Sequence, residues 1–329
     1  YSMVVDSNGY LYIGGSFTQV NSVPYNYFAK YDTAVGQRVW TTLSTGTVGL
    51  NGTVYAIAVL DSSTIYVGGA FTTAGGTTVN YIAKYTTATQ AWSALNGAAG
   101  TIGVNSQVRA LAISGTDLYV GGYFITAGNV TVKCIAKWDT GTSTWSALGS
   151  GLNGYVLALA VSGSDLYAGG SFTKTGDLVT TLNRVAKWNG SAWSALGSGT
   201  VGANGNVMAL TMISTDLYVG GSFTLAGGIT NTVRIAKWDT GTSTWSALGT
   251  GMNGTVMALA SIDTNLYAGG SFTTAGGVTV NRVAKWDGGA WSALGSGMNG
   301  SVYAIAVMGT DLYVSGSFTT AGGITANRV

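Results

Sequence analysis

The amino-acid sequence predicts an all-β protein built from repeated copies of one four-stranded unit. First, a Gly-Gly-x-Phe element recurs at intervals of 46 to 54 residues. Second, apolar residues occur in short runs that are bounded by turn residues, as in strands. Third, the chain has 52 glycines and no glutamate, a composition that serves helices poorly. The repeated phenylalanines are Phe17, Phe71, Phe124, Phe172, Phe223, Phe272 and Phe318.

The first two strands of each copy form a predicted hairpin. Residues 108–113 and 156–161 are apolar on both faces and carry alanine on alternate positions, which indicates a strand covered on both sides where space is tight. A turn such as 114–117 leads to a second strand that ends in two glycines. Glycine inside a strand marks close approach of another backbone, so we expect the Gly-Gly pairs to lie against the neighbouring sheet.

The third and fourth strands follow a glycine-rich loop. The third strand is expected at residues 184–188 and 234–238, each ending in Ala-Lys-Trp. The fourth strand is a Trp-Ser-Ala-Leu segment, with a looser version at Trp40. Its tryptophans are Trp92, Trp145, Trp193, Trp245 and Trp291.

Small four-stranded sheets of this kind cannot bury their own faces, so neighbouring copies must cover them. Radial stacking at a period of about 50 residues predicts a β-propeller of seven four-stranded antiparallel blades. The last blade is expected to be incomplete, because no Trp-Ser-Ala-Leu segment follows residue 318, and we expect the chain to be a fragment of a longer one. The sequence is interpreted as one domain, 1–329. Its repeat units are about 1–50, 51–104, 105–152, 153–203, 204–252, 253–298 and 299–329.

Three segments carry a family resemblance: Leu217–Thr224 (Leu-Tyr-Val-Gly-Gly-Ser-Phe-Thr), Asn281–Asp287 (Asn-Arg-Val-Ala-Lys-Trp-Asp) and Trp291–Leu294. They resemble the kelch and galactose-oxidase-like propeller repeats of secreted bacterial and fungal cortical-marker proteins. The resemblance covers nearly the whole chain and implies the architecture, whereas propellers host enzymes, lectins and scaffolds alike. The usual offsets of Gly-Gly, Tyr and Trp in kelch repeats are missing, which leaves the subfamily open.

Composition excludes several classes of partner. Charged residues make up 8% of the chain, and 14 basic and 12 acidic residues give a formal net charge of +2 without a basic stripe, so nucleic-acid binding is not expected. The apolar runs are about one strand long, so membrane insertion is not expected either. The single cysteine, Cys134, lies in an apolar strand pattern and is predicted to be buried and inert.

Catalysis and cofactors are not expected. The chain has no histidine and no glutamate, and the copper chemistry of galactose oxidase requires histidine ligands. A glycosidase that uses two converging Asp carboxylates stays an alternative. No segment has the acid density of a calcium loop, so a metal would need carbonyls and isolated Asp side chains from several loops.

Other repeated residues have both a structural and a functional interpretation. The tryptophans are expected to pack between blades rather than to form sugar platforms. The lysine of Ala-Lys-Trp is expected beside a turn Asp or over an aromatic ring. Five Asn-x-Ser/Thr sequons are interpreted as turns, with glycosylation as the alternative in a secretory context. They begin at Asn51, Asn129, Asn189, Asn253 and Asn299.

The sequence is interpreted as a non-enzymatic extracellular or cell-surface interaction module that binds a protein through one propeller face. The alternatives are a structural subunit that self-assembles into a filament, sheath or virion appendage, and a glycan-binding lectin. We expect the partner to contact the loops where the copies differ, 21–27, 98–105 and 174–182, and the recurring loops 149–154 and 295–300. The candidate residues are Asn21, Tyr25, Tyr27, Thr101, Asn105, Asn153, Lys174, Asp177 and Asn299.

Overall fold

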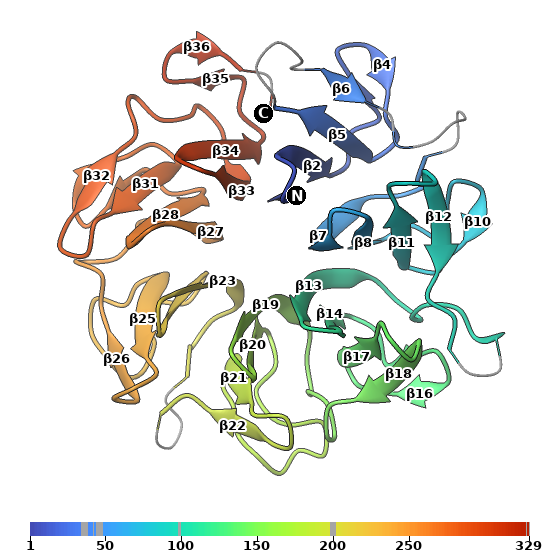
Figure 1. Cartoon of the computed structure of the whole chain (residues 1–329). Helices are drawn as coiled ribbons and strands as arrows, with labels where there is room; N and C mark the ends of the chain where they lie inside the picture. Colours follow the sequence, from blue (N-terminus) through green and yellow to red (C-terminus); the bar gives the residue numbers. More distant parts are fainter. Residues whose placement is uncertain are drawn as a thin grey trace. The chain divides into compact units, whose positions relative to one another are not determined.

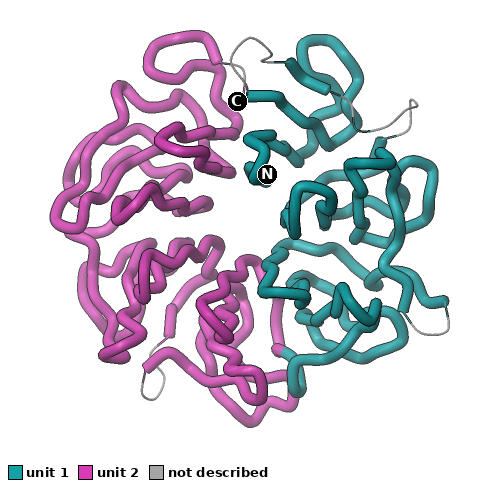
Figure 2. The backbone as a smooth tube through the Cα atoms, viewed as in Figure 1, with its two compact units in different colours: residues 1–151 teal, residues 152–329 magenta. Residues whose placement is uncertain are grey.

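A computed structural model of the chain describes residues 1–33, 39–41, 43, 49–97, 100–197, 202–326 and 328. The described residues contain β-strands and turns and no α-helix. They form two compact units, residues 1–151 and 152–329 (Figure 2). Each unit is described by itself.

Unit 1 contains three four-stranded antiparallel sheets in which the strands pair in the order first, second, third, fourth (Figure 1). A two-stranded hairpin is inserted between the second and third strand of each sheet. The first sheet is β1 (Ser2–Val5), β2 (Tyr10–Gly14), β5 (Phe28–Asp32) and β6 (Trp40–Thr41). The second is β7 (Val54–Asp61), β8 (Thr64–Gly69), β11 (Ile82–Thr86) and β12 (Ala91–Ala94). The third is β13 (Val108–Ser114), β14 (Asp117–Gly122), β17 (Ile135–Asp139) and β18 (Thr144–Ala147). The inserted hairpins are β3 (Gln19–Val20) with β4 (Val23–Pro24), β9 (Thr73–Ala74) with β10 (Thr77–Thr78), and β15 (Thr126–Ala127) with β16 (Val130–Thr131).

Unit 2 contains three four-stranded antiparallel sheets with the same strand order, followed by the two-stranded sheet of the seventh repeat. Its first complete sheet is β19 (Val156–Ser162), β20 (Asp165–Gly170), β21 (Val185–Trp188) and β22 (Trp193–Ala195). The next is β23 (Val207–Ile213), β24 (Asp216–Gly221), β25 (Ile235–Asp239) and β26 (Thr244–Ser246). The last is β27 (Val256–Ile262), β28 (Asn265–Gly270), β31 (Val283–Trp286) and β32 (Trp291–Ala293). The two-stranded sheet is β33 (Val302–Met308) with β34 (Asp311–Gly316), and the inserted hairpins are β29 (Thr274–Ala275) with β30 (Val278–Thr279) and β35 (Thr320–Ala321) with β36 (Ile324–Thr325).

The sheets within a unit stack face to face through their first strands. β7 packs between β1 and β13 in unit 1, while β23 and β27 pack in succession between β19 and β33 in unit 2. The second strands of the complete repeats are the most deeply buried elements, and the phenylalanine that follows Gly-Gly is at most 1% exposed in every repeat from Phe71 onward. This stacking of small twisted sheets is the blade arrangement of a β-propeller, as the sequence predicts.

The prediction of seven four-stranded blades is wrong, because the described residues form six. In the seventh repeat the blade sheet consists of β33 and β34 alone, beside the inserted hairpin β35–β36, and no third or fourth blade strand is assigned among its described residues. The predicted third strand there reaches residues 327 and 329, which lie outside the described residues. The Gly-Gly-x-Phe motif marks a second strand. The number of these motifs therefore gives the number of second strands. A complete blade also needs the third strand, with Lys-Trp, and the fourth strand, with Trp-Ser-Ala-Leu.

The fourth-strand tryptophans Trp145, Trp193, Trp245 and Trp291 are buried and pack as predicted, whereas Trp40 and Trp92 are half-buried. Trp238 and Trp245 face each other across β25 and β26 with ring centroids 5.3 Å apart. Trp245 Nε1 also donates a hydrogen bond to the Leu196 carbonyl of the preceding blade, at 3.0 Å. Aromatic pairs of this kind contribute about 0.5–1.5 kcal/mol beyond the area that they bury. The tryptophans therefore join the strands within a blade and the blades to one another.

Candidate functional site

The predicted loops of each unit gather at one end of its blades, here called the loop face. At this end the first strand begins and the second strand ends, because the two strands are antiparallel. In each unit, the loop face consists of entry loops before the first strands and face hairpins after the second strands. The described entry loops are 49–53, 97 and 100–107 in unit 1, and 152–155, 202–206, 251–255 and 297–301 in unit 2. The face hairpins are 17–27, 71–81 and 124–134 in unit 1, and 172–183, 223–234, 272–282 and 318–326 in unit 2.

One asparagine in each entry loop holds the adjacent face hairpin. Asn153 Oδ1 accepts hydrogen bonds from the backbone amides of Thr173 and Lys174, both at 2.8 Å, and its Nδ2 donates to Thr173 Oγ1 at 3.1 Å. The predicted residues Asn153 and Lys174 are thus brought together. The same contact is made by Asn51, Asn204, Asn253 and Asn299, and Asn105 makes its two backbone bonds.

This asparagine contact revises the interpretation of the sequons. Asn51, Asn253 and Asn299 were expected to form turns, and instead their side chains bind across to the next hairpin. Asn189 does cap a turn, since its Oδ1 accepts from the backbone amides of Ser191 and Ala192. Asn129 is exposed in the β15–β16 hairpin. Glycosylation at these positions stays a prediction.

Three of the predicted residues lie in the face hairpin 17–27, and one of them is poorly placed to meet a partner. Asn21 is exposed, with a φ of 50° in the hairpin turn. Tyr25 is only 8% exposed, and its ring packs edge-on against Trp40. Burial raises the pKa of Tyr25. Tyr27, half-buried, donates its amide to the Phe17 carbonyl at 2.9 Å. Tyr25 is therefore a packing residue.

The loop 98–105 is partly described, since residues 98 and 99 lie outside the described residues. Thr101 accepts a hydrogen bond from the Gly97 amide through its carbonyl, at 2.8 Å. Asn105 lies beyond it and holds the hairpin β15–β16 through the amides of Ile125 and Thr126.

The hairpin 172–183 carries two adjacent exposed apolar side chains, one of which, Val179, is the most exposed of the large hydrophobic residues in the described part of the chain. Asp177 Oδ1 accepts bonds from Thr175 Oγ1 and from the Val179 amide, which fixes the turn. Leu178 and Val179 are 58% and 80% exposed. Lys174 is exposed as well. This hairpin therefore offers a fixed turn with apolar side chains at its tip.

Charged side chains elsewhere in the blades are engaged in structural contacts. Three blade lysines of the described residues, Lys137, Lys187 and Lys237, form ion pairs with turn aspartates, as in Lys237–Asp216 at 2.8 Å with both side chains less than a third exposed. Lys30 lies over the Tyr10 ring at 3.2 Å. Both contacts were predicted. The described residues hold no group of three or more His, Cys, Asp or Glu side chains that would suit a metal ion. In the same ranges, no helix is long and apolar enough to cross a membrane.

In unit 1, the first strands β7 and β13 bring an arginine close to tyrosine rings, a cluster that sequence reasoning missed. The Arg109 guanidinium lies 4.0 Å from the Tyr55 ring centroid and 5.3 Å from that of Tyr123. The Tyr1 and Tyr55 rings are 5.6 Å apart. The signal was present in the sequence, because Tyr55 and Arg109 occupy the same position of their repeats.

A second missed feature is the arginine that precedes the third strand. Arg184 Nη1 donates to the Ala203 carbonyl at 3.0 Å, and Arg234 Nη1 donates to the Met252 carbonyl at 2.9 Å. Each bond joins a face hairpin to the next entry loop. The motif Asn-Arg-Val-Ala carries the family resemblance in the sequence, but its local pattern does not indicate this bond to the next entry loop.

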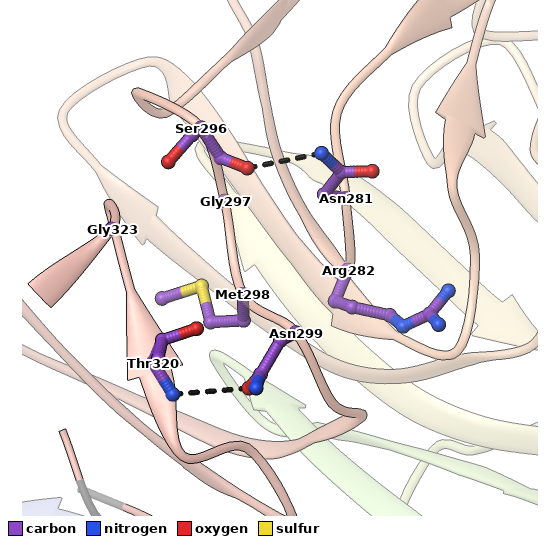
Figure 3. A pocket seen from close by; sticks show the side chains of 8 residues that line it. All are labelled: Asn281, Arg282, Ser296, Gly297, Met298, Asn299, Thr320 and Gly323. Atoms are coloured by element: carbon purple, nitrogen blue, oxygen red, sulfur yellow. Dashed lines mark hydrogen bonds between the residues drawn. The ribbon is translucent and has the colours of Figure 1, made fainter. Parts of the chain in front are cut away.

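The equivalent Arg282 does not make this bond, and a pocket lies beside it (Figure 3). Its Nη1 donates instead to the Ser271 carbonyl of its own blade, at 3.0 Å. The pocket has a volume of about 350 Å³ and contains one of the predicted residues, Asn299. Its lining residues are Asn281, Arg282, Ser296, Gly297, Met298, Asn299, Thr320 and Gly323.

The stacked four-stranded blades of each unit, with their loops at one end, define a β-propeller repeat protein. The family model of the Rax2 C-terminal beta propeller domain matches residues 2–113, 100–215 and 194–277. These matches cover most of the chain, which therefore belongs to this family. The match confirms a β-propeller repeat protein and leaves the kelch or galactose-oxidase type, and the cortical-marker type, as predictions.

Solved structures share the fold at low sequence identity. The extracellular domain of a B. thetaiotaomicron protein, described once as a one component system and once as a hybrid two component system, gives TM-scores of 0.63 and 0.62 at 13% identity. The match covers 96% of this chain and 37% of the length of that chain. The computationally designed Ika8 protein gives a TM-score of 0.56 at 16% identity, over 98% of this chain and 93% of its own. No curated protein matches the sequence.

Proposed function

We propose that this propeller is a non-enzymatic interaction module that binds a protein partner through its loop face. The observation that carries the proposal is where exposed apolar side chains occur. Most of the large exposed hydrophobic residues in the described part of the chain lie on face hairpins. They are Val23, Ile125, Leu178, Val179, Leu225, Ile229, Val278 and Ile324.

Exposed apolar side chains on an ordered loop are suited to a protein interface. Burying them against a partner contributes about 25 cal/mol per Å² of apolar surface. All of the face hairpins except 17–27 are held by entry-loop asparagines, so little ordering is required on binding. Pre-organisation of this kind favours affinity. The hairpin tips also differ from copy to copy in sequence, which favours recognition of one partner over uniform packing.

The same proposal includes that the protein has no catalytic activity. General acid and base work would depend on Asp, since the sequence has no His and no Glu. Asp139, Asp239 and Asp287 accept hydrogen bonds from backbone amides of their own turns, and Asp117, Asp165 and Asp216 form ion pairs with lysines. These engagements favour a structural role for the acidic residues.

We further propose an extracellular or cell-surface location, of the secreted cortical-marker type that the repeats resemble. The B. thetaiotaomicron protein that shares the fold is an extracellular domain, which is compatible with this location. The low charged fraction of 8% and the Thr-, Ser- and Gly-rich composition point the same way.

The test immobilises this protein, as wild type and as variants, and passes over it the proteins of the surface fraction of the producing cells. The proteins that the wild type and each variant retain are then compared. We expect at least one protein to bind saturably to the wild type and to be lost with the double variant Leu178→Asp and Val179→Asp. Ser164→Asp is the matched control, because Ser164 is exposed in the turn of β19 and β20 at the opposite end of the same blade. A partner that is retained by the double variant, or is lost equally with the control, contradicts use of the loop face.

The two alternatives have their own measurements. A structural subunit should assemble with rising concentration in light scattering, and the hairpin variants should abolish the assembly. A lectin should give a positive glycan array without assembly. Either result, in the absence of a protein partner, replaces the proposed function.

A further inference from the structure

The fold separates the acidic side chains of each unit from its loop face. Along the sequence acidic and basic residues are interspersed, and the formal net charge is only +2. In the fold, aspartates lie where first or third strands end and second or fourth strands begin, which is the end opposite the loop face. In unit 1 these are Asp6, Asp32, Asp61, Asp117 and Asp139. In unit 2 they are Asp165, Asp216, Asp239, Asp263, Asp287 and Asp311, and Asp177 is the exception.

The loop face carries mainly basic residues. In unit 1, Lys133 belongs to the face hairpin 124–134 and Arg109 lies two residues beyond the entry loop 100–107, and no described aspartate lies at this end. In unit 2 the only aspartate among the described loop-face residues is Asp177. The basic residues in the face hairpins of unit 2, or within two residues of them, are Lys174, Arg184, Arg234, Arg282 and Arg328.

The aspartates at the opposite end do not cancel this basic charge. Three of them form ion pairs with blade lysines at their own end, as in Lys237–Asp216. A second strand such as β24 has 6 residues and spans about 20 Å at about 3.3 Å per residue. The Debye length at physiological ionic strength is about 8 Å, so exposed charges at the two ends are largely screened from each other. Arg184 and Arg234 donate to backbone carbonyls, which leaves their positive charge in place.

The basic residues share their hairpins with exposed apolar side chains. Lys174 is exposed in the hairpin that carries Leu178 and Val179. Lys133 is exposed in the hairpin that carries Ile125, which is 57% exposed. The hairpins that end at Arg234 and Arg282 also carry exposed apolar side chains, Leu225 and Ile229 in the first and Val278 in the second. A partner that covers these hairpins therefore meets cationic and apolar groups together.

This combination fits an acidic protein surface better than an anionic polymer. Surfaces that bind nucleic acid carry a dense stripe of Lys and Arg. Here the described basic residues of the loop face number at most two per repeat, with exposed apolar side chains between them. Complementary charge across a protein interface speeds association and disfavours partners of like charge. Apolar side chains would remain in water against a polymer of charged groups and are buried against a protein.

We propose that the loop face recognises an acidic protein surface, whose carboxylates pair with the basic residues while its apolar side chains pack on the hairpin tips. The inference rests on the proposed function and specifies the chemistry of the partner. Lys133 and Lys174 supply exposed positive charge in unit 1 and unit 2, respectively.

The experiment titrates the whole chain with three short fluorescent peptides of equal length and follows binding by anisotropy. The first contains glutamate and leucine in a serine background, the second has glutamine in place of glutamate, and the third has serine in place of leucine. We expect the glutamate–leucine peptide to bind about tenfold more tightly than either of the others at low salt. Its advantage over the glutamine peptide should shrink in high salt, which screens exposed charges.

Two double variants test where the glutamate–leucine peptide binds. Lys133→Gln with Lys174→Gln removes one loop-face charge from each unit and should weaken binding about fivefold, as expected for exposed ion pairs. Lys84→Gln with Lys285→Gln is the matched control, because these lysines lie in the third strands β11 and β31 and their loss gives the same net charge. The control should bind like the wild type. Thermal unfolding of each variant shows that it is folded.

The proposal is overturned if no peptide binds, if the glutamine peptide binds as tightly as the glutamate–leucine peptide, or if the two double variants weaken binding equally. Equally tight binding of the leucine-free peptide also overturns it and indicates a site for anionic polymers. Failure of the proposed function is seen separately, in the capture test with the Leu178 and Val179 variant. A partner captured through that hairpin, together with peptides that show no preference for glutamate, retains the proposed function and removes the acidic partner.

Discussion

Gly220 of β24 packs directly against Val256 of β27 in the next blade. A Cβ atom placed on Gly220 would lie 2.5 Å from Val256 Cγ1, closer than any real contact of this kind. Gly14, Gly68, Gly169 and Gly269 meet the first-strand valine of the next blade in the same way. The first glycine of each pair is therefore the close contact between sheets that the sequence predicted.

Gly220→Ala should destabilise the fold, because the added methyl forces Val256 or the sheet itself to shift. Overpacking of a filled core costs about 1–3 kcal/mol. Urea denaturation of the wild type and the variant measures the difference. Gly289→Ala is the control, since a Cβ at Gly289 has Asp287 Oδ1 as its nearest neighbour, at 3.8 Å. Equal loss of stability in both variants would mean that inter-blade packing is not the cause.

Asn153→Ala should lower the free energy of unfolding by about 1–2 kcal/mol, because two backbone amides and one hydroxyl lose their partner. Asn153→Asp should recover most of this loss, since a carboxylate still accepts from the amides of Thr173 and Lys174. Denaturant unfolding measures stability, and amide hydrogen exchange at Thr173 and Lys174 locates the change. If the Ala and Asp variants are equally stable, the asparagine contact does not hold the hairpin.

Acid should weaken the turns between the third and fourth strands. Backbone amides, first Thr142 and then Gly141, hold the pKa of Asp139 below its ordinary value of 3.8, and the pKa values of Asp239 and Asp287 are lowered similarly. Because the folded pKa is lower than the unfolded one, the stabilisation is fully present above about pH 4 and is lost as pH falls through the folded pKa.

The triple variant Asp139→Asn, Asp239→Asn and Asp287→Asn tests this pH dependence. Asn189 already occupies the equivalent position and accepts the same backbone bonds, so the turns should survive the substitution. We expect the variant to lose less stability than the wild type between about pH 5 and pH 2.5. Parallel pH profiles for the two proteins would show that other groups govern acid unfolding.

Cys134 should be unreactive in the folded protein. The thiol is buried, and burial raises its pKa to about 11, so little thiolate is present at neutral pH. Ellman's reagent should label it slowly in native buffer and rapidly in denaturant. Fast labelling of the native protein would require the strand β17 to open near its start.

Periodicity made most of the fold predictable. The strands, the buried tryptophans and the Lys237–Asp216 type of ion pair all follow from patterns that recur in several copies, and repetition separates a packing role from chance. The number of blades was not predictable from the same count, because a second strand recurs in the seventh repeat without a complete sheet around it.

The candidate site was less predictable, because exposure and partner choice depend on neighbours far away in sequence. Tyr25 lies in a variable loop, yet it is buried against Trp40. Asn153 reads locally as a turn residue, and its side chain binds a hairpin 20 residues further along the chain. A local pattern contains neither contact.

The sequence by itself determined the all-β class, the repeat, the order of strands within each blade and the near absence of residues for acid–base chemistry. These depend on local periodicity and composition. The tertiary structure decided which copies depart from the repeat. Arg184, Arg234 and Arg282 are the same residue in the same motif, and only the packing of each hairpin against the next entry loop makes the first two close the space and the third leave a pocket.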